Sequence, residues 1–140
     1  MLKTIGTISM QDMRYLNIFH KVTKIHSDFC FFYNNTLFFC VPKKFIFKAI
    51  GENNSNLKKV SDLIGKRIKV VPTPKSISHA KEFIKIVINP VEISDIETNN
   101  SELIINAGKE KSMLFGRDKK KFFELQKIVK TLFGRELKII

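Results

Sequence analysis

The segment KAIGENNSNLKKVSDLIGKRIKVV, residues 48–71, decides the fold of this 140-residue chain. A short apolar stretch ends at Gly51 and a polar loop follows. Apolar residues then recur at helical spacing until Gly65, which ends the helix, and β-branched residues predict a strand over 67–71. The segment therefore predicts a helix, a glycine loop, a second helix and a strand, in that order.

The same order of elements returns near the C-terminus. Residues 114–140 contain Gly116, a polar loop, a longer helical stretch, Gly134 and a strand over 135–140. From Gly116 to Gly134 is 18 residues, against 14 between the matching glycines of the first copy, so the second helix is longer by about one turn. This repeat indicates two copies of one small domain.

Each copy opens with a helix and a strand hairpin. Ser9 is placed to cap the first helix, and the paired asparagines Asn34–Asn35 and Asn99–Asn100 are turn formers between strands. The expected segments are helices over 9–26 and 79–88 and strands over 29–33, 36–41, 91–98 and 101–107. In the first helix the expected apolar face consists of Met13, Leu16, Phe19, Val22 and Ile25.

These patterns predict an α+β fold with two domains, residues 1–74 and 75–140. Each has the order helix, strand, strand, helix, loop, helix, strand. A copy of about 70 residues lies near the lower limit for independent folding. We therefore expect the two domains to be packed together.

The two cysteines are expected to be buried, reduced thiols. If Asn34–Asn35 forms a two-residue turn, Cys30 pairs with Phe39 and Cys40 with Phe29. Neighbouring side chains alternate across a strand, so the two thiols point to opposite faces of the hairpin and cannot form a disulfide. They show no CxxC spacing. We expect no metal site and no cofactor.

The charge of the chain favours a polyanionic partner. There are 25 Lys and Arg against 13 Asp and Glu, a net charge of +12, while 44% of the residues are apolar, as in a folded domain. Nucleic acid is the first candidate, and an acidic membrane surface is the second. The apolar runs are far shorter than the roughly 20 residues of a membrane helix, and the N-terminus has no signal-peptide pattern. We expect a cytoplasmic protein with no membrane partner.

The sequence gives little support for catalysis. His20, His26 and His79 are scattered, and there is no HExxH, no GxSxG and no Walker phosphate loop. No pair of carboxylates stands in an apolar setting that would indicate general acid–base chemistry. We expect a binding protein and not an enzyme.

The order of elements, with a glycine loop between two helices, resembles the type II KH fold. The resemblance narrows to the archaeal NusA-like proteins, which consist of two KH domains in tandem. It rests on the opening helix (9–25), the first glycine loop with its helix and strand (48–71), the entry to the second domain (83–93) and the second glycine loop (114–134). It implies that the chain binds single-stranded RNA and acts in transcription elongation and termination, with RNA polymerase as a partner.

Both loops depart from the family pattern. In a KH loop the first glycine lets the backbone approach the RNA, and N–H groups of the next helix receive a phosphate. The family has a second glycine at the fourth position, where this chain has Asn54 and Lys119. Glu52 and Asp118 add carboxylates that repel phosphate. Two interpretations remain: the loops contact RNA, or they persist only as helix connectors.

The residues expected to contact RNA are the two loops and the cations near them. Three lysines at a helix start, Lys119–Lys121, oppose the helix dipole, and they are either a clamp for an anionic partner or a solvated helix start. Residues 1–75 hold 13 Lys and Arg against 4 Asp and Glu, a surplus of 9, whereas 76–140 hold 12 against 9, a surplus of 3, so the first copy is the expected electrostatic footprint. The full set is Gly51, Glu52, Asn53, Asn54, Lys58, Lys59, Lys66, Arg67, Lys69, Gly116, Arg117, Asp118, Lys119, Lys120 and Lys121.

The sequence thus leads to the hypothesis of a monomeric, cytoplasmic tandem KH protein that binds single-stranded RNA in transcription termination or elongation control. A ribosomal or ribosome-assembly KH protein is one alternative, because such proteins are equally small and basic. A module whose degenerate loops have lost RNA and which binds RNA polymerase by protein contacts is the other.

Overall fold

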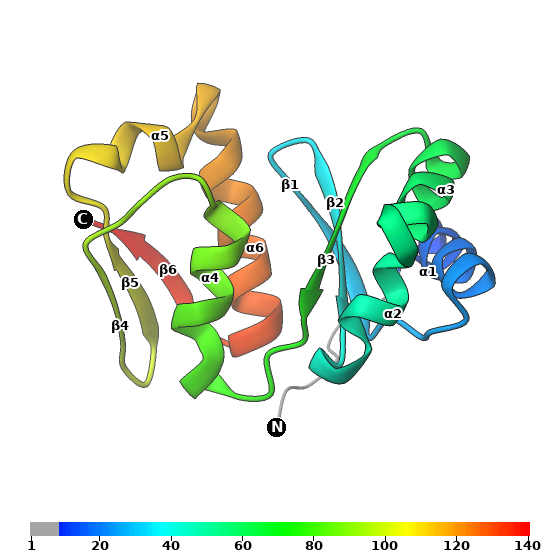
Figure 1. Cartoon of the computed structure of the whole chain (residues 1–140). Coiled ribbons are helices and arrows are strands. Elements are labelled where there is room, and N and C mark those ends of the chain that lie inside the picture. The colour runs from blue at the N-terminus through cyan, green and yellow to red at the C-terminus, as the bar shows by residue number, and fades with distance from the viewer. Residues whose placement is uncertain (1–8) are drawn as a thin grey trace. The chain divides into compact units, whose positions relative to one another are not determined.

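The computed structural model describes residues 9–140 (Figure 1). Residues 1–8, where the sequence predicts no signal peptide, lie outside the described residues. The rest divides into two compact units, residues 9–73 and Pro74–Ile140. The described residues form six α-helices and two three-stranded mixed sheets, an α+β architecture of two tandem KH-like domains.

The two units repeat one topology. In each, the first two strands are antiparallel and the last strand pairs in parallel with the second, at the edge of the sheet. The first unit contains α1 (Met10–Thr23), β1 (Phe29–Tyr33), β2 (Thr36–Val41), α2 (Ile46–Ile50), α3 (Ser55–Ile64) and β3 (Arg67–Pro72). The second contains α4 (Ala80–Ile88), β4 (Asp95–Thr98), β5 (Glu102–Asn106), α5 (Lys111–Phe115), α6 (Lys120–Phe133) and β6 (Glu136–Ile139).

The first hairpin has the predicted register. Asn34 and Asn35 adopt φ of 51° and 59°, the left-handed values that a two-residue turn of this kind requires at both central positions. Phe29 therefore pairs with Cys40, and Cys30 with Phe39. Alternate residues of the two strands face opposite sides of the sheet.

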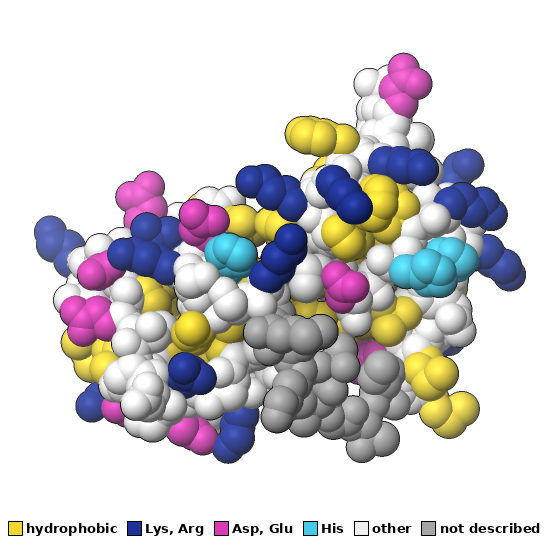
Figure 2. All heavy atoms as spheres, turned by 90° about the horizontal axis from the view of Figure 1, so that it is seen from below, with side chains coloured by type: hydrophobic (Ala, Val, Ile, Leu, Met, Phe, Trp, Pro, Cys, Tyr) yellow, Lys and Arg dark blue, Asp and Glu magenta, His cyan; other side chains and the backbone are white. Residues whose placement is uncertain are grey.

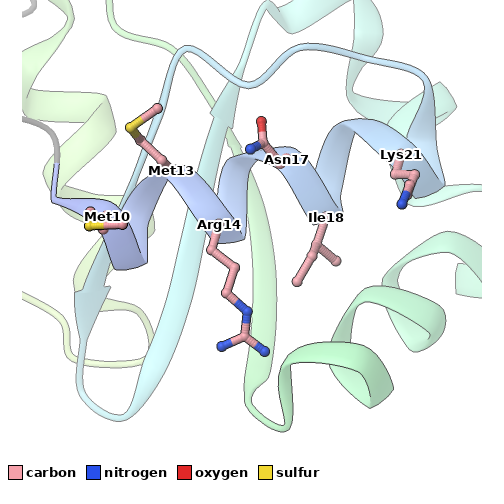
Figure 3. A pocket seen from close by; sticks show the side chains of 6 residues that line it. All are labelled: Met10, Met13, Arg14, Asn17, Ile18 and Lys21. Carbon is pink, nitrogen blue, oxygen red and sulfur yellow. The ribbon is translucent and has the colours of Figure 1, made fainter.

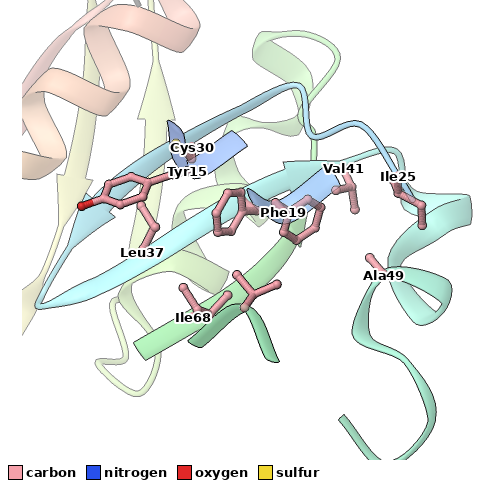
Figure 4. Packing of buried hydrophobic residues seen from close by; sticks show 10 residues of the cluster. Tyr15, Phe19, Ile25, Cys30, Leu37, Val41, Ala49 and Ile68 are labelled. Carbon is pink, nitrogen blue, oxygen red and sulfur yellow. The ribbon is translucent and has the colours of Figure 1, made fainter. Parts of the chain in front are cut away.

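The core of the first unit lies between its sheet and its three helices (Figure 4). Phe19 of α1 stacks on Phe39 of β2 with ring centres 4.3 Å apart, and Tyr15 meets Phe32 edge to face at 5.9 Å. Ala49 of α2 and Val60 of α3 complete the cluster from the helix side.

The expected apolar face of α1 was partly wrong. The helix buries Tyr15, Phe19 and Thr23, while Met13 is 52% exposed. Residues spaced three apart, as in the expected stripe, drift around a helix of 3.6 residues per turn, so one face cannot hold them all. Ile25 is buried, but it lies beyond the end of the helix.

The second hairpin is shorter than predicted and its turn has a different cause. The strand expected from residue 91 begins at Asp95, because the partner strand β5 ends at Asn106, whose carbonyl accepts from the N–H of Ser94 at 2.9 Å. The Asn99 carboxamide oxygen accepts from the N–H groups of Ser101 (2.9 Å) and Glu102 (2.7 Å). These two side-chain hydrogen bonds close the turn together with the bond from the Asn99 N–H to the Glu102 carbonyl, at 2.9 Å, and neither Asn99 nor Asn100 is left-handed.

The core of the second unit follows the predicted helices. Its buried side chains come mainly from one face each of α4 and α6, and from alternate positions of the strands. Phe83 of α4 meets Phe133 of α6 edge to face, with ring centres 5.9 Å apart. Among residues 9–140, no helix is both long enough and apolar enough to span a membrane.

Both cysteines are buried and unpaired, in agreement with the predicted register. Burial raises the pKa of the Cys30 thiol to about 12, and the nearby Asp12 adds to the shift. Burial also raises the pKa of Cys40 well above its usual value, with smaller contributions from Asp28 and Cys30. Both thiols are therefore protonated and shielded at neutral pH.

We predict that neither thiol of the native protein reacts at pH 8 with an aromatic disulfide reagent on the timescale of minutes. The reactive species is the thiolate, which burial disfavours. In denaturing urea both thiols should react at once, and the released chromophore counts them. Rapid labelling of either cysteine without denaturant would contradict the buried placement of β1 and β2.

Candidate nucleic-acid interface

The two glycine loops follow the same backbone path. Each begins at a glycine with positive φ, and each closes with a hydrogen bond from the fourth residue to the glycine carbonyl, at 3.2 Å for Asn54 and 3.3 Å for Lys119. The φ and ψ angles are 80° and 167° at Gly51, 55° and 35° at Asn53, 61° and 23° at Asn54, 71° and −178° at Gly116, 54° and 27° at Asp118, and 60° and 22° at Lys119.

The first position of each loop requires glycine for two reasons. Its backbone angles lie in a region that is essentially restricted to glycine. A Cβ atom on Gly51 would also lie 2.8 Å from Ser55 Oγ and 3.0 Å from the backbone nitrogen of Asn56, and one on Gly116 would lie 2.8 Å from Lys121 Cγ. The loop backbone therefore passes directly against the first turn of the helix that follows it.

The fourth position keeps its shape without glycine. Asn54 and Lys119 both adopt the left-handed conformation, which costs an L-residue about 1–2 kcal/mol and which asparagine tolerates better than lysine. The departure from the family pattern therefore changes the side chain at this position and not the path of the loop.

The helices that follow the loops begin without a side-chain cap. Neither Asn54 nor Lys119 makes a side-chain capping bond, and the first turns of α3 and α6 contain no acidic residue. In α1, by contrast, Ser9 Oγ accepts from the N–H of Asp12 at 3.0 Å. The backbone N–H of Ser55 donates to the Glu52 carbonyl, and that of Lys120 donates to the Arg117 carbonyl. The dipole of each helix is positive at this end, so both loops remain candidate places for an anion beside the rest of the first turn.

Four cations and one acid surround the second loop. Arg117, Lys119 and Lys120 are exposed, and so is Asp118. Lys121 is half-buried, because its aliphatic stem lies over Gly116 while its ammonium group can reach solvent. The structure thus brings all the predicted residues of this loop to one place.

The first loop has fewer cations close to it. Glu52, Asn53 and Asn54 are exposed, and Lys58 and Lys59 are exposed in α3, about one turn beyond the loop. No predicted residue before Lys58 in this copy carries a positive charge.

The remaining predicted cations of the first unit lie away from its loop. Lys66 follows the C-terminal end of α3, which has 10 residues and a length of about 15 Å, and its Nζ lies 5.2 Å from the centre of the Phe32 ring. Lys69 pairs with Phe38 and has its Nζ 5.9 Å from that ring. Since Phe38 points away from the helix-side core, Lys69 lies on the sheet face opposite α1, α2 and α3.

Arg67 shares that opposite face, since it precedes Lys69 by two residues on β3 and pairs with Thr36. The basic cluster expected around the first loop is therefore distributed over three places. Lys58 and Lys59 are the predicted cations that the structure leaves beside the loop.

Two exposed phenylalanines next to the loops were missed by the sequence analysis. Phe47 of α2 is 88% exposed and Phe123 of α6 is 57% exposed. Figure 2 shows hydrophobic side chains at the surface, with Lys and Arg side chains beside them. The signal in the sequence is a lysine pair three and four residues before each ring.

The histidines are less scattered than the sequence indicated. The rings of His20 and His26 stack with centres 3.8 Å apart, and His79 Nδ1 accepts from the N–H of Lys75 at 3.2 Å. Within residues 9–140 there is no group of three or more His, Cys, Asp or Glu side chains placed to hold a metal ion.

A shallow hollow lies along the outer face of α1 (Figure 3). Its lining side chains belong to this one helix, on the side turned away from Tyr15 and Phe19. They are Met10, Met13, Arg14, Asn17, Ile18 and Lys21.

Comparison with known proteins finds a relative in structure. The chain is similar to the archaeal protein APE1850, known from its crystal structure, with a TM-score of 0.64 and 25% sequence identity over 95% of this chain and 100% of that one. No protein-family model matches the sequence, and no curated protein matches it. The similarity extends over both KH-like units.

We predict that Gly51→Ala destabilises the protein by about 2–3 kcal/mol, since it combines a glycine-only conformation with a steric clash. The matched control is Gly65→Ala, where φ is also positive, at 77°, but a Cβ would meet nothing within 4 Å. The control should lose about 1 kcal/mol. Urea denaturation followed by circular dichroism gives both values, and equal losses would show that Gly51 is not held against α3.

Proposed function

We propose that this chain binds single-stranded RNA through its two glycine loops and acts in transcription termination or elongation control, as a NusA-like tandem KH protein. The observation that carries the proposal is the identical path of the two loops, each ending at an uncapped helix N-terminus.

The binding chemistry follows from the loop geometry. A phosphate placed before α3 or α6 accepts hydrogen bonds from N–H groups of the first turn, and the glycine leaves the backbone open to its approach. Exposed lysine and arginine side chains add attraction at longer range, which depends on salt. Single-stranded RNA supplies phosphates that each loop can accept in this way.

The carboxylates in the loops make the two loops unequal as phosphate sites. Glu52 and Asp118 are exposed and oppose a phosphate. In the second loop four cations within residues 117–121 outweigh Asp118, whereas the matching residues 52–56 of the first copy contain Glu52 and no cation. The second loop is therefore the stronger phosphate site in this proposal, although the first copy has the larger overall surplus of charge.

The role in transcription is the finer part of the proposal and rests on the resemblance to NusA-like proteins. It assigns the protein to the cytoplasm, as a monomeric RNA-binding factor without catalytic activity that contacts RNA polymerase. Copurification separates the roles: enrichment with RNA polymerase supports the transcription role, and enrichment with ribosomal subunits supports the alternative of a ribosome-associated KH protein.

We predict that the wild-type chain binds a short single-stranded RNA with a Kd in the micromolar range or tighter, and that it binds duplex DNA more weakly. Replacing Arg117, Lys119, Lys120 and Lys121 together by alanine should weaken RNA binding. If each cation neutralises one phosphate, the slope of log K against log salt should become shallower by about 3. Fluorescence anisotropy over a salt series measures both quantities.

The matched control replaces four exposed lysines outside the loops, Lys75, Lys85, Lys109 and Lys138, by alanine. It removes the same net charge, so it isolates position from charge. Circular dichroism of both variants should match the wild type, because seven of the eight replaced side chains are exposed and the eighth, Lys121, is only half-buried. Equal losses of affinity in the two variants would contradict the loop as the site.

A further inference from the structure

Phe47 and Phe123 differ from the other described phenylalanines in their exposure to solvent. The chain has 13 phenylalanines, all within residues 9–140, and these two are the ones that are exposed. Burying such a side chain contributes about 1.5–3 kcal/mol, and a ring left largely in water forgoes much of that stabilisation. Their exposure indicates a role outside the core.

Each of the two rings lies in a helix next to one of the glycine loops. Phe47 lies in the helix before the first loop, and its carbonyl accepts from the N–H of Gly51 at 3.1 Å. Phe123 lies in the first turn of the helix after the second loop.

The two rings have the same charged residues before them in the sequence. The segments are KKFIF at 43–47 and KKKFF at 119–123, so a lysine pair stands three and four residues before each exposed ring. Lys120 and Phe123 stand three residues apart within α6 and therefore lie on the same side of that helix. Lys119 precedes α6 in the left-handed conformation, and Lys44 has its Nζ 5.1 Å from the centre of the Phe45 ring. All four lysines are exposed: Lys43, Lys44, Lys119 and Lys120.

The shared pattern of a lysine pair before an exposed phenylalanine does not follow from the internal repeat of the sequence. When the two copies are aligned on the loop glycines, Ser112 stands where Phe47 would be, and Lys58 stands where Phe123 would be. The first unit carries its ring before the loop and the second carries it after the loop. Both copies thus have an exposed ring beside lysines, through different positions.

Phe123 is supported from behind by other rings. It packs edge to face on Phe122 with centres 5.6 Å apart, and Phe122 stacks on Phe115 at 5.1 Å. The row of three rings ends at Gly116, one residue after Phe115. The outermost ring is therefore held in place while it remains open to solvent.

We propose that Phe47 and Phe123 are stacking platforms for the bases of single-stranded RNA. The inference rests on the proposed function and extends it from the phosphates to the bases. The neighbouring lysines and the helix N-terminus hold the backbone of the strand, and an unpaired base lies flat on the ring. Stacking of this kind accepts any base, since every base has a π-face, and it selects single strands over duplexes.

The absence of tryptophan from the sequence allows a direct test. Phe47→Trp and Phe123→Trp each introduce one indole as the sole tryptophan, and a base stacked on it quenches its fluorescence. We expect quenching by single-stranded RNA and none by an abasic oligomer of the same length. The control is Leu63→Trp, at a residue that is 61% exposed near the far end of α3 from the loop, where quenching should be absent.

A second readout uses Phe47→Leu and Phe123→Leu, which keep an apolar side chain but remove the π-face. Each should lose about fivefold or more in affinity for single-stranded RNA, with unchanged affinity for the abasic oligomer. If wild-type protein binds RNA while the indoles are not quenched and the leucine variants bind normally, the stacking inference is wrong and the proposed function stands. If wild-type protein binds neither single-stranded RNA nor the abasic oligomer, the stacking inference and the proposed function are both wrong.

Discussion

The contact between each loop glycine and the first turn of the next helix determines how the rest of the candidate interface is built. Gly51 lies against Ser55 and Asn56, and Gly116 lies against Lys121, at distances that leave no room for a side chain. Two left-handed residues then turn the chain into the helix, so that the N–H groups of its first turn face no side-chain cap. A bulkier first residue would push the loop off the helix and close the approach to those groups. The anion site, its cations and its aromatic neighbours all depend on this close approach.

The two copies keep one backbone and place different chemistry on it. At the fourth loop position the first copy has Asn54 and the second has Lys119, with φ angles of 61° and 60°. Residues 51–56 of the first loop contain one charged side chain, that of Glu52. Residues 116–121 of the second loop contain four cations and Asp118. If both loops bind RNA as proposed, their unequal charge predicts unequal shares of the binding free energy. Most of the salt dependence would then come from the second loop.

Much of the fold could be predicted because local signals and long-range packing agree. The glycines, the Asn34–Asn35 turn and the alternation in the first hairpin each specify a backbone conformation, and the register followed from them. The arrangement of the predicted cations could not be obtained in the same way. Lys69 is close to the first loop in sequence order, but strand alternation turns it to the opposite face of the sheet, over Phe38. Phe47 and Phe123 were missed because an apolar residue in a helical segment is usually part of a core, and only the packing shows that these two are exposed.

Backbone amide chemical shifts in NMR spectra, recorded while single-stranded RNA is added, test the use of the glycine loops most directly. We predict that the largest changes fall in two short segments, from Gly51 into the first turn of α3 and from Gly116 into the first turn of α6, with the second segment responding at lower RNA concentration. Changes concentrated elsewhere, with both segments unmoved at saturating RNA, would contradict the assignment of the loops as the RNA-binding site.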